Sequence, residues 1–235
     1  MTSPVDGSGS SSLAARLSAI DEKIAAAAQA AGRSSEEITR IVVTKFHPAS
    51  LVRDLHDLGV RDVGENRQQE LSAKQAELAT RGLRWHFIGQ GQTNKAAAIR
   101  RSADVVHSVD RDRFADALHR AADGEGRLEV LVQINLTDDP GRGGVVPAQA
   151  VALAEHVLTL PSLHLRGVMA VAPLDEEPAS AFARLRDVSD SVRAVDPSAS
   201  WISAGMTGDF AEAIAVGATH LRIGSAITGP RPDRG

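Results

Sequence analysis

Residues 202–225 read ISAGMTGDFAEAIAVGATHLRIGS and predict a strand, a short helix and a second strand. The apolar runs at 201–203 and 219–223 each lead into glycine and hydroxyl residues, and residues 209–216 between them have helical spacing. Parallel strands joined in this way end at the same edge of a sheet. Glycines let the backbone approach a ligand and hydroxyls donate hydrogen bonds, so the two strand ends predict a phosphate site. Ordinary turn chemistry is the alternative.

The same alternation of apolar runs and helical patterns extends over the whole chain. Eight strands are expected, at residues 38–43, 60–63, 85–88, 105–109, 128–134, 163–171, 201–203 and 219–223. Helices are expected at residues 13–31, 51–58, 68–79, 114–122, 148–158, 179–195 and 209–216. This order favours one closed (β/α)8 TIM barrel with a leading N-terminal helix over an open sheet. In such a barrel the site lies at the C-terminal strand ends.

Composition narrows the class of protein. The chain has 235 residues, 43% of them hydrophobic and 24% charged, with a formal net charge of -4, which disfavours nucleic acid as a partner. It has no cysteine, and its eight histidines lack the spacing of a metal site. Residues 1–12 predict a flexible tail ahead of a single barrel domain at 13–235. Without a signal peptide or a membrane-spanning run, we expect a cytoplasmic protein.

Lys45 is the candidate covalent residue. It is one of four lysines among 26 basic residues and follows the apolar run at 41–43. Lysine can deprotonate and condense with an aldehyde, so Lys45 is a candidate Schiff-base lysine. The alternative is a strand-end lysine that reaches water. Lys95 is the competing candidate because it lies near the same rim.

Polar residues gather at the ends of the other expected strands as well. They are residues 64–67, 86–94, 107–110, Asn135, Met169, 203–207 and 222–225. Turn chemistry explains any one of them, but not their joint occurrence at the same end of successive strands.

Five motifs carry a family resemblance. GENR at 64–67, WHFIGQGQTNK at 85–95, HSVD at 107–110, SAGMTGDFAEAI at 203–214 and LRIGSAITG at 221–229 resemble the pyridoxal-phosphate homeostasis protein family. The resemblance implies a barrel like the N-terminal domain of alanine racemases, of fold type III. It also implies pyridoxal 5'-phosphate as the cofactor, held as an aldimine on Lys45. The implied role is that of a cofactor carrier, with PLP-dependent apoenzymes as possible recipients.

The resemblance also implies the roles of single residues. Arg222 would face the pyridine nitrogen, and Met169 completes the rim at the sixth strand. The phosphate-binding positions are Ser203, Thr207, Gly224 and Ser225, and Asn66 and Asn94 are the polar residues near the ring. The chain departs from the family at Ala204 for a usual methionine, Gly91 for leucine, Thr228 for an aromatic residue, and Phe46-His47 for a threonine-lysine pair.

The residues disfavour catalysis. Arg222 stays protonated and only donates hydrogen bonds, so a ring nitrogen beside it remains unprotonated and the cofactor is a weak electron sink. The chain has no tyrosine to serve as a racemase's second base, although His86 and His107 are chemically able to move protons. We therefore expect no robust enzymatic activity, and a monomer, because the racemases' dimer-forming second domain is missing.

Three other functions stay open. A PLP-dependent racemase or lyase would use the same site, and a phosphosugar-binding barrel would need no cofactor. The sequence Ile88-Gly89-Gln90-Gly91, with Asp110 about twenty residues on, resembles a dinucleotide fingerprint but lacks its third glycine.

Overall fold

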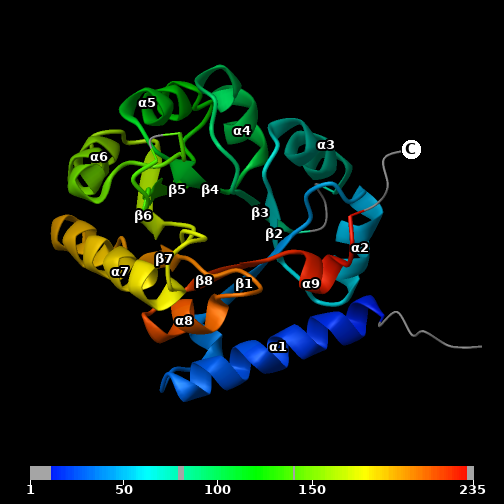
Figure 1. Ribbon diagram of the computed structural model, residues 1–235. Helices are drawn as coiled ribbons and strands as arrows, with labels where there is room; N and C mark the ends of the chain where they lie inside the picture. Colours follow the sequence, from blue (N-terminus) through cyan, green and yellow to red (C-terminus); the bar gives the residue numbers. More distant parts are fainter. Residues whose placement is uncertain (1–11, 79–81, 140, 232–235) are drawn as a thin grey trace, which may run out of the picture.

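Eight parallel strands close into one barrel in chain order in the computed structural model (Figure 1). The structure describes residues 12–78, 82–139 and 141–231. The strands are β1 Thr39–Val43, β2 Asp62–Glu65, β3 Arg84–Phe87, β4 Val105–Val109, β5 Leu128–Gln133, β6 Leu163–Met169, β7 Trp201–Ser203 and β8 His220–Ile223. Closure is made by β1 and β8, where Ile41 lies opposite Arg222. The predicted TIM barrel is confirmed.

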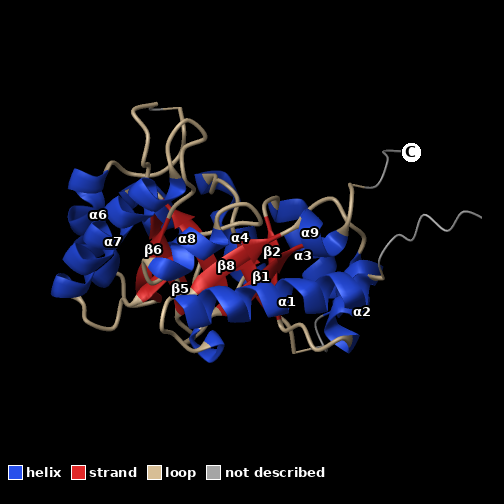
Figure 2. Cartoon of the chain, turned by 60° about the horizontal axis from the view of Figure 1, so that its bottom comes forward, coloured by secondary structure: helices blue, strands red, loops and turns tan. Residues whose placement is uncertain are grey.

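Helices surround the strands on all sides (Figures 1 and 2). They are α1 Leu13–Ala30, α2 Ala49–Asp57, α3 Gln68–Leu78, α4 Ala96–Ser102, α5 Asp112–Arg120, α6 Ala150–Leu158, α7 Pro178–Val195, α8 Phe210–Ala215 and α9 Ser225–Thr228. Short 3-10 turns occupy Ser35–Glu37, Thr93–Lys95 and Pro147–Gln149. None of the described helices is both long and apolar enough to cross a membrane.

The predicted leading helix is present as α1, and it packs against α8 and α9 (Figure 1). Its buried side chains, Leu17, Ile20, Ile24 and Ala28, recur at helical spacing and so form one face. The hydroxyl of Ser12 caps the helix by accepting from the Ala15 N–H at 3.2 Å. The remainder of the predicted tail lies outside the described residues.

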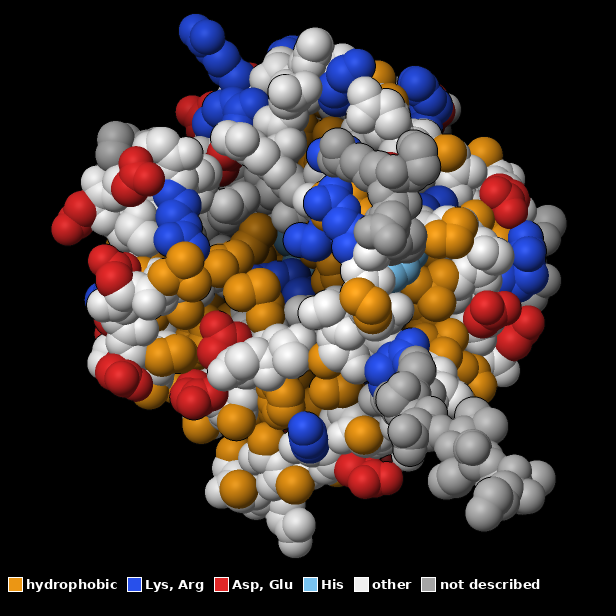
Figure 3. Space-filling view, turned by 45° about the vertical axis from the view of Figure 1, so that its right-hand side comes forward, with side chains coloured by type: hydrophobic (Ala, Val, Ile, Leu, Met, Phe, Trp, Pro, Cys, Tyr) orange, Lys and Arg blue, Asp and Glu red, His pale blue; other side chains and the backbone are white. Residues whose placement is uncertain are grey.

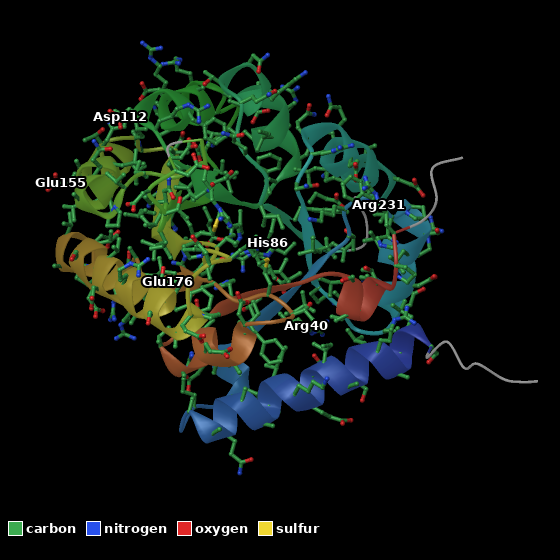
Figure 4. All side chains as sticks on the ribbon, viewed as in Figure 1. Arg40, His86, Asp112, Glu155, Glu176 and Arg231 are labelled. Atoms are coloured by element: carbon green, nitrogen blue, oxygen red, sulfur yellow. The ribbon has the colours of Figure 1, made fainter. Side chains whose placement is uncertain are left out.

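The barrel interior is unusually polar. TIM barrels normally fill this space with branched aliphatic side chains. Here Val105, Leu131 and Met169 form a small apolar cluster with Trp201 packed on it. The neighbouring buried polar side chains are His86, His107, Ser203, His220 and Arg222. Figure 4 shows His86 inside the ring of strands. These polar side chains extend to the C-terminal end of the barrel, where Ser203 ends β7 and Arg222 lies on β8.

Candidate functional site

Lys45 lies in the turn directly after β1, and its side chain is exposed. It makes no hydrogen bond or ion pair with any of the described residues. The other lysines differ in placement: Lys74 is buried in ion pairs, Lys95 ends a 3-10 turn at the rim, and Lys23 is exposed on α1. Lys45 is therefore the lysine at a strand end whose amine is left available.

The backbone on both sides of Lys45 is held by α3. Lys74 Nζ donates to the carbonyl oxygen of Thr44 at 2.9 Å, and the Phe46 N–H donates to Glu70 Oε2 at 2.8 Å. Phe46 has φ of 69°, in the left-handed region that a bulky residue rarely adopts. These contacts hold the turn in a conformation that the sequence alone would not favour.

Positive charge surrounds this turn. The Phe46 ring lies between two guanidinium groups, with Arg67 at 4.9 Å and Arg231 at 3.4 Å from the ring centroid. A neighbouring cavity of about 310 Å³ is lined by Asn66, Arg67 and Lys95, among others. The Oδ1 atom of Asn66 is buried and has no hydrogen-bond partner among the residues that the structure describes. Figure 3 shows Lys and Arg side chains gathered in and beside a hollow on one face of the molecule. The rim suits an anionic ligand.

Arg222 lies inside the barrel, at the third position of β8. Its Nη1 donates to Ser203 Oγ at 2.7 Å and its Nη2 to the carbonyl oxygen of Ala170 at 2.8 Å. Burial lowers the pKa of Arg222 to about 10, so the guanidinium remains charged at neutral pH. Since a guanidinium has five N–H donors, donors remain for a ligand.

The predicted phosphate residues lie on the two loops after β7 and β8. These loops are adjacent because Ser203 pairs with His220. Thr207 and Ser225 are exposed, and Ser225 opens α9 directly after Gly224. Gly205 shapes the first loop with φ of 91°, and a Cβ there would lie 2.8 Å from that of Ala213. Two hydroxyls and free backbone N–H groups thus stand at one rim.

The remaining predicted residues are distributed around the same rim. Met169 ends β6 and is buried, opposite Ser203 of β7. Asn94 is exposed in the 3-10 turn before α4. The unusual Gly91 has a direct explanation, since a Cβ there would lie 2.1 Å from the Phe114 ring. Phe114 occupies the space that a leucine would need.

Sequence reasoning missed the buried support of the site. It did not single out Lys74 or Asp62, and it treated His86 and His107 only as possible acids and bases. The alternation of side chains along a strand was the available signal, since it places residues 84 and 86 on one face of β3. The hydrogen bonds between these buried groups form only when the barrel closes. No local sequence pattern predicts them.

Comparison with known proteins identifies relatives over nearly the whole chain. The family model described as alanine racemase, N-terminal domain, matches residues 15–232. The pyridoxal phosphate homeostasis protein of Mycobacterium tuberculosis is 42% identical, over 94% of this chain and 93% of its own length. The protein of that name from Escherichia coli is 39% identical, over 93% and 97%.

Solved structures agree with these relatives. PipY of Synechococcus elongatus PCC7942, determined with PLP bound, matches with a TM-score of 0.81 and 32% identity, over 93% of this chain and 100% of PipY. Alanine racemase from Corynebacterium glutamicum matches with a TM-score of 0.66 at 17% identity, over 90% of this chain and 60% of the racemase, and shares the fold. The chain belongs to the pyridoxal phosphate homeostasis protein family, whose barrel is that of the alanine racemase N-terminal domain.

Proposed function

We propose that this protein binds pyridoxal 5'-phosphate and acts in its homeostasis as a carrier of the cofactor. The relatives bear that name, and PipY was determined with PLP bound. The observation that carries the proposal is the exposed amine of Lys45, which has no partner among the described residues and follows β1, beside the strand that holds Arg222.

The residues present fit the three reactive ends of the cofactor. Lys45 supplies an amine for the aldehyde, because it follows β1, which pairs with the strand of Arg222, and its amine has no partner among the described residues. Arg222 supplies N–H donors for the ring nitrogen. Thr207, Gly224 and Ser225 supply hydroxyl and backbone donors for the phosphate. Asn66, whose Oδ1 has no hydrogen-bond partner among the described residues, and Asn94 would be the polar residues near the cofactor ring.

Ser203 differs from the other predicted phosphate residues. Its hydroxyl is fully buried and already contacts Arg222 and His107. We therefore propose Thr207, Gly224 and Ser225 as the direct phosphate donors. Ser203 would act on the cofactor through Arg222.

The chemistry of the site favours retention of the cofactor over catalytic turnover of amino acids. Bound PLP supplies an electrophilic aldehyde and an electron sink whose strength depends on protonation of its ring nitrogen. Arg222, charged and buried, would donate to that nitrogen and so keep it unprotonated. The sequence has no tyrosine to move a proton on the opposite face. These features support a carrier; recipient apoenzymes, a monomeric state and a cytoplasmic location are part of the same proposal.

The proposal is tested by an absorbance scan of purified protein incubated with PLP and freed of excess cofactor. A visible band that disappears on borohydride reduction is expected for the wild type and for Lys23→Ala, a matched change of an exposed lysine on α1. Lys45→Ala should fold normally and show no such band. A wild-type protein without any visible band would favour the phosphosugar-binding alternative.

A further inference from the structure

A chain of buried hydrogen bonds crosses the barrel interior from its N-terminal end to Arg222. Asp62 Oδ1 lies 2.9 Å from His86 Nε2, and His86 Nδ1 lies 2.9 Å from His107 Nε2. His107 Nδ1 lies 2.9 Å from Ser203 Oγ, which accepts from Arg222 Nη1 at 2.7 Å. We name Asp62, His86, His107 and Ser203 the histidine relay. It joins β2, β3 and β4 to β7 across the barrel.

The two ends of the histidine relay force one direction on its protons. Asp62 as a carboxylate only accepts, so His86 donates to it from Nε2, and a neutral His86 then accepts at Nδ1 from His107 Nε2. A neutral His107 in turn accepts at Nδ1 from the Ser203 hydroxyl, whose oxygen accepts from Arg222. Every donor has an acceptor, and both histidines carry their proton on Nε2.

The surroundings support neutral histidines. Burial lowers the pKa of His86, and burial with its charged neighbours lowers that of His107 well below the ordinary value. Although burial alone raises it, the hydrogen bond from His86 holds the pKa of Asp62 below its ordinary value. The other titratable and charged groups that face the relay are Arg84, Asp104, Arg166 and His220.

Arg222 is a buried cation without an ion-pair partner among the described residues. Its hydrogen-bond acceptors are a hydroxyl and a backbone carbonyl. A carboxylate in direct contact would stabilise its charge but would also occupy the N–H groups that a ligand needs. Because hydrogen-bonded chains in a low dielectric polarise one another, Asp62 can act on Arg222 through the relay without occupying those groups.

We propose that the histidine relay positions Arg222 toward the ring nitrogen of the cofactor and conveys to it part of the negative charge of Asp62. The members of the relay are positioning residues. This inference rests on the proposed PLP binding, but the relay itself can be tested without cofactor.

The first experiment uses cofactor-free, 15N-labelled protein at pH 7. Long-range nitrogen–proton correlations distinguish a protonated ring nitrogen from an unprotonated one. His86 and His107 should both be neutral and protonated on Nε2. A charged His107, or one protonated on Nδ1, would overturn the relay, because His107 Nδ1 could then not accept the Ser203 proton.

The second experiment compares His107→Phe and His107→Gln with Ser108→Ala. Phenylalanine removes both ring contacts, whereas glutamine keeps one donor and one acceptor. Ser108 is the matched control, a buried neighbour on β4 whose hydroxyl has no partner among the described residues. His107→Phe should speed hydrogen exchange of the Arg222 guanidinium in the cofactor-free protein and weaken PLP retention about tenfold, the equivalent of one hydrogen bond to a charged group.

The visible spectrum of the bound cofactor separates positioning from simple loss of structure. His107→Phe should shift the band and its pH titration, His107→Gln should restore them in part, and Ser108→Ala should match the wild type. If His107→Phe is too unstable to purify, His107→Gln and the ring-nitrogen assignment decide. A spectrum and an Arg222 exchange rate that no relay variant alters would refute the proposal. Failure of the wild type to take up PLP would refute the proposed function instead, while the ring-nitrogen assignment would still decide whether the relay exists.

Discussion

The ammonium nitrogen of Lys74 lies 2.6 Å from Oε1 of Glu65, and both side chains are buried. The same oxygen accepts from the Thr44 hydroxyl at 2.6 Å, and Lys74 also donates to the Thr44 carbonyl. This buried pair connects α3 and β2 to the residue that precedes Lys45. The backbone position of Lys45, the candidate covalent residue, thus depends on Lys74, a second lysine that has no proposed role in binding the cofactor.

Lys74→Met should lower the free energy of unfolding by about 3 to 5 kcal/mol, because it leaves Glu65 buried and unpaired. Urea unfolding at pH 7.5 measures the loss. Burial already raises the pKa of Glu65, so the variant's deficit should shrink as pH falls and Glu65 takes up a proton. Lys23→Met, on the exposed face of α1, should change stability by less than about 0.5 kcal/mol. If Lys74→Met and Lys23→Met lowered the free energy of unfolding equally, the Lys74–Glu65 pair would not be needed for stability.

Stability should fall as the pH is lowered from 7.5 to 5.5. Burial lowers the pKa values of His86 and His107, and that of His220 to about 3. The unfolded chain therefore binds protons below about pH 6.5 that the folded chain does not, so the stabilisation is present above that pH and lost below it. His220, with its pKa at about 3, accounts for a loss of about 1.4 kcal/mol at pH 5.5, and His86 and His107 add to that loss. The midpoints of urea unfolding at pH 7.5 and pH 5.5 measure this loss of stability.

Substitution of single histidines tests which residues cause the pH dependence of stability. His220→Phe keeps a ring against Trp201 and should remove the His220 share of the dependence, about 1.4 kcal/mol. His56→Gln, at a partly exposed histidine on α2, should leave it unchanged. The account is contradicted by a wild type that is equally stable at both pH values.

The phosphate group should contribute most of the affinity for the cofactor. Thr207→Ala or Ser225→Ala should each weaken PLP retention roughly tenfold or more, because a hydrogen bond to a charged group contributes about 1.5 to 3 kcal/mol. Pyridoxal, which lacks the phosphate, should bind poorly to the wild type. Competitive dialysis measures these affinities, with Ser191→Ala on the exposed side of α7 as the control. Similar affinities for PLP and pyridoxal would exclude this phosphate site.

The loaded protein should turn over common amino acids negligibly. In the proposed site Arg222 would donate to the ring nitrogen, and the sequence contains no tyrosine as a second base. Incubation with alanine or serine in deuterated water, followed by NMR of the α-proton, measures the rate. Slow exchange is expected of any accessible bound cofactor. Inversion near the enzymatic median of about 10 per second would instead favour the racemase alternative.

The strand order and the placement of the rim residues could be predicted because they follow local patterns. Each expected strand exists, and Lys45, Thr207 and Ser225 follow the strands expected to carry them. His86 and His107, expected at the rim, instead lie buried inside the barrel. Strand boundaries follow the sequence pattern less closely. The pattern predicts a strand at residues 60–63, whereas β2 begins at Asp62. Val60 instead completes the end of α2, where its N–H donates to the carbonyl of Leu55 after Gly59 turns the chain.

The support of the site could not be predicted, because it joins residues far apart in sequence. His107 and Ser203 meet only because the barrel closes. The left-handed backbone of Phe46 is equally unexpected from the sequence, since contacts with α3 hold it. Local patterns thus predicted which residues reach the rim, but not which buried groups position them.

Peptide mapping of the borohydride-reduced PLP adduct tests the central claim most directly. The wild-type protein, reduced after loading and digested, should yield one labelled peptide with the pyridoxyl group on Lys45. Lys95→Ala, at the other rim lysine, should give the same labelled peptide in the same amount. A label on Lys95 in the wild type, or a label retained in Lys45→Ala at wild-type yield, would contradict the account.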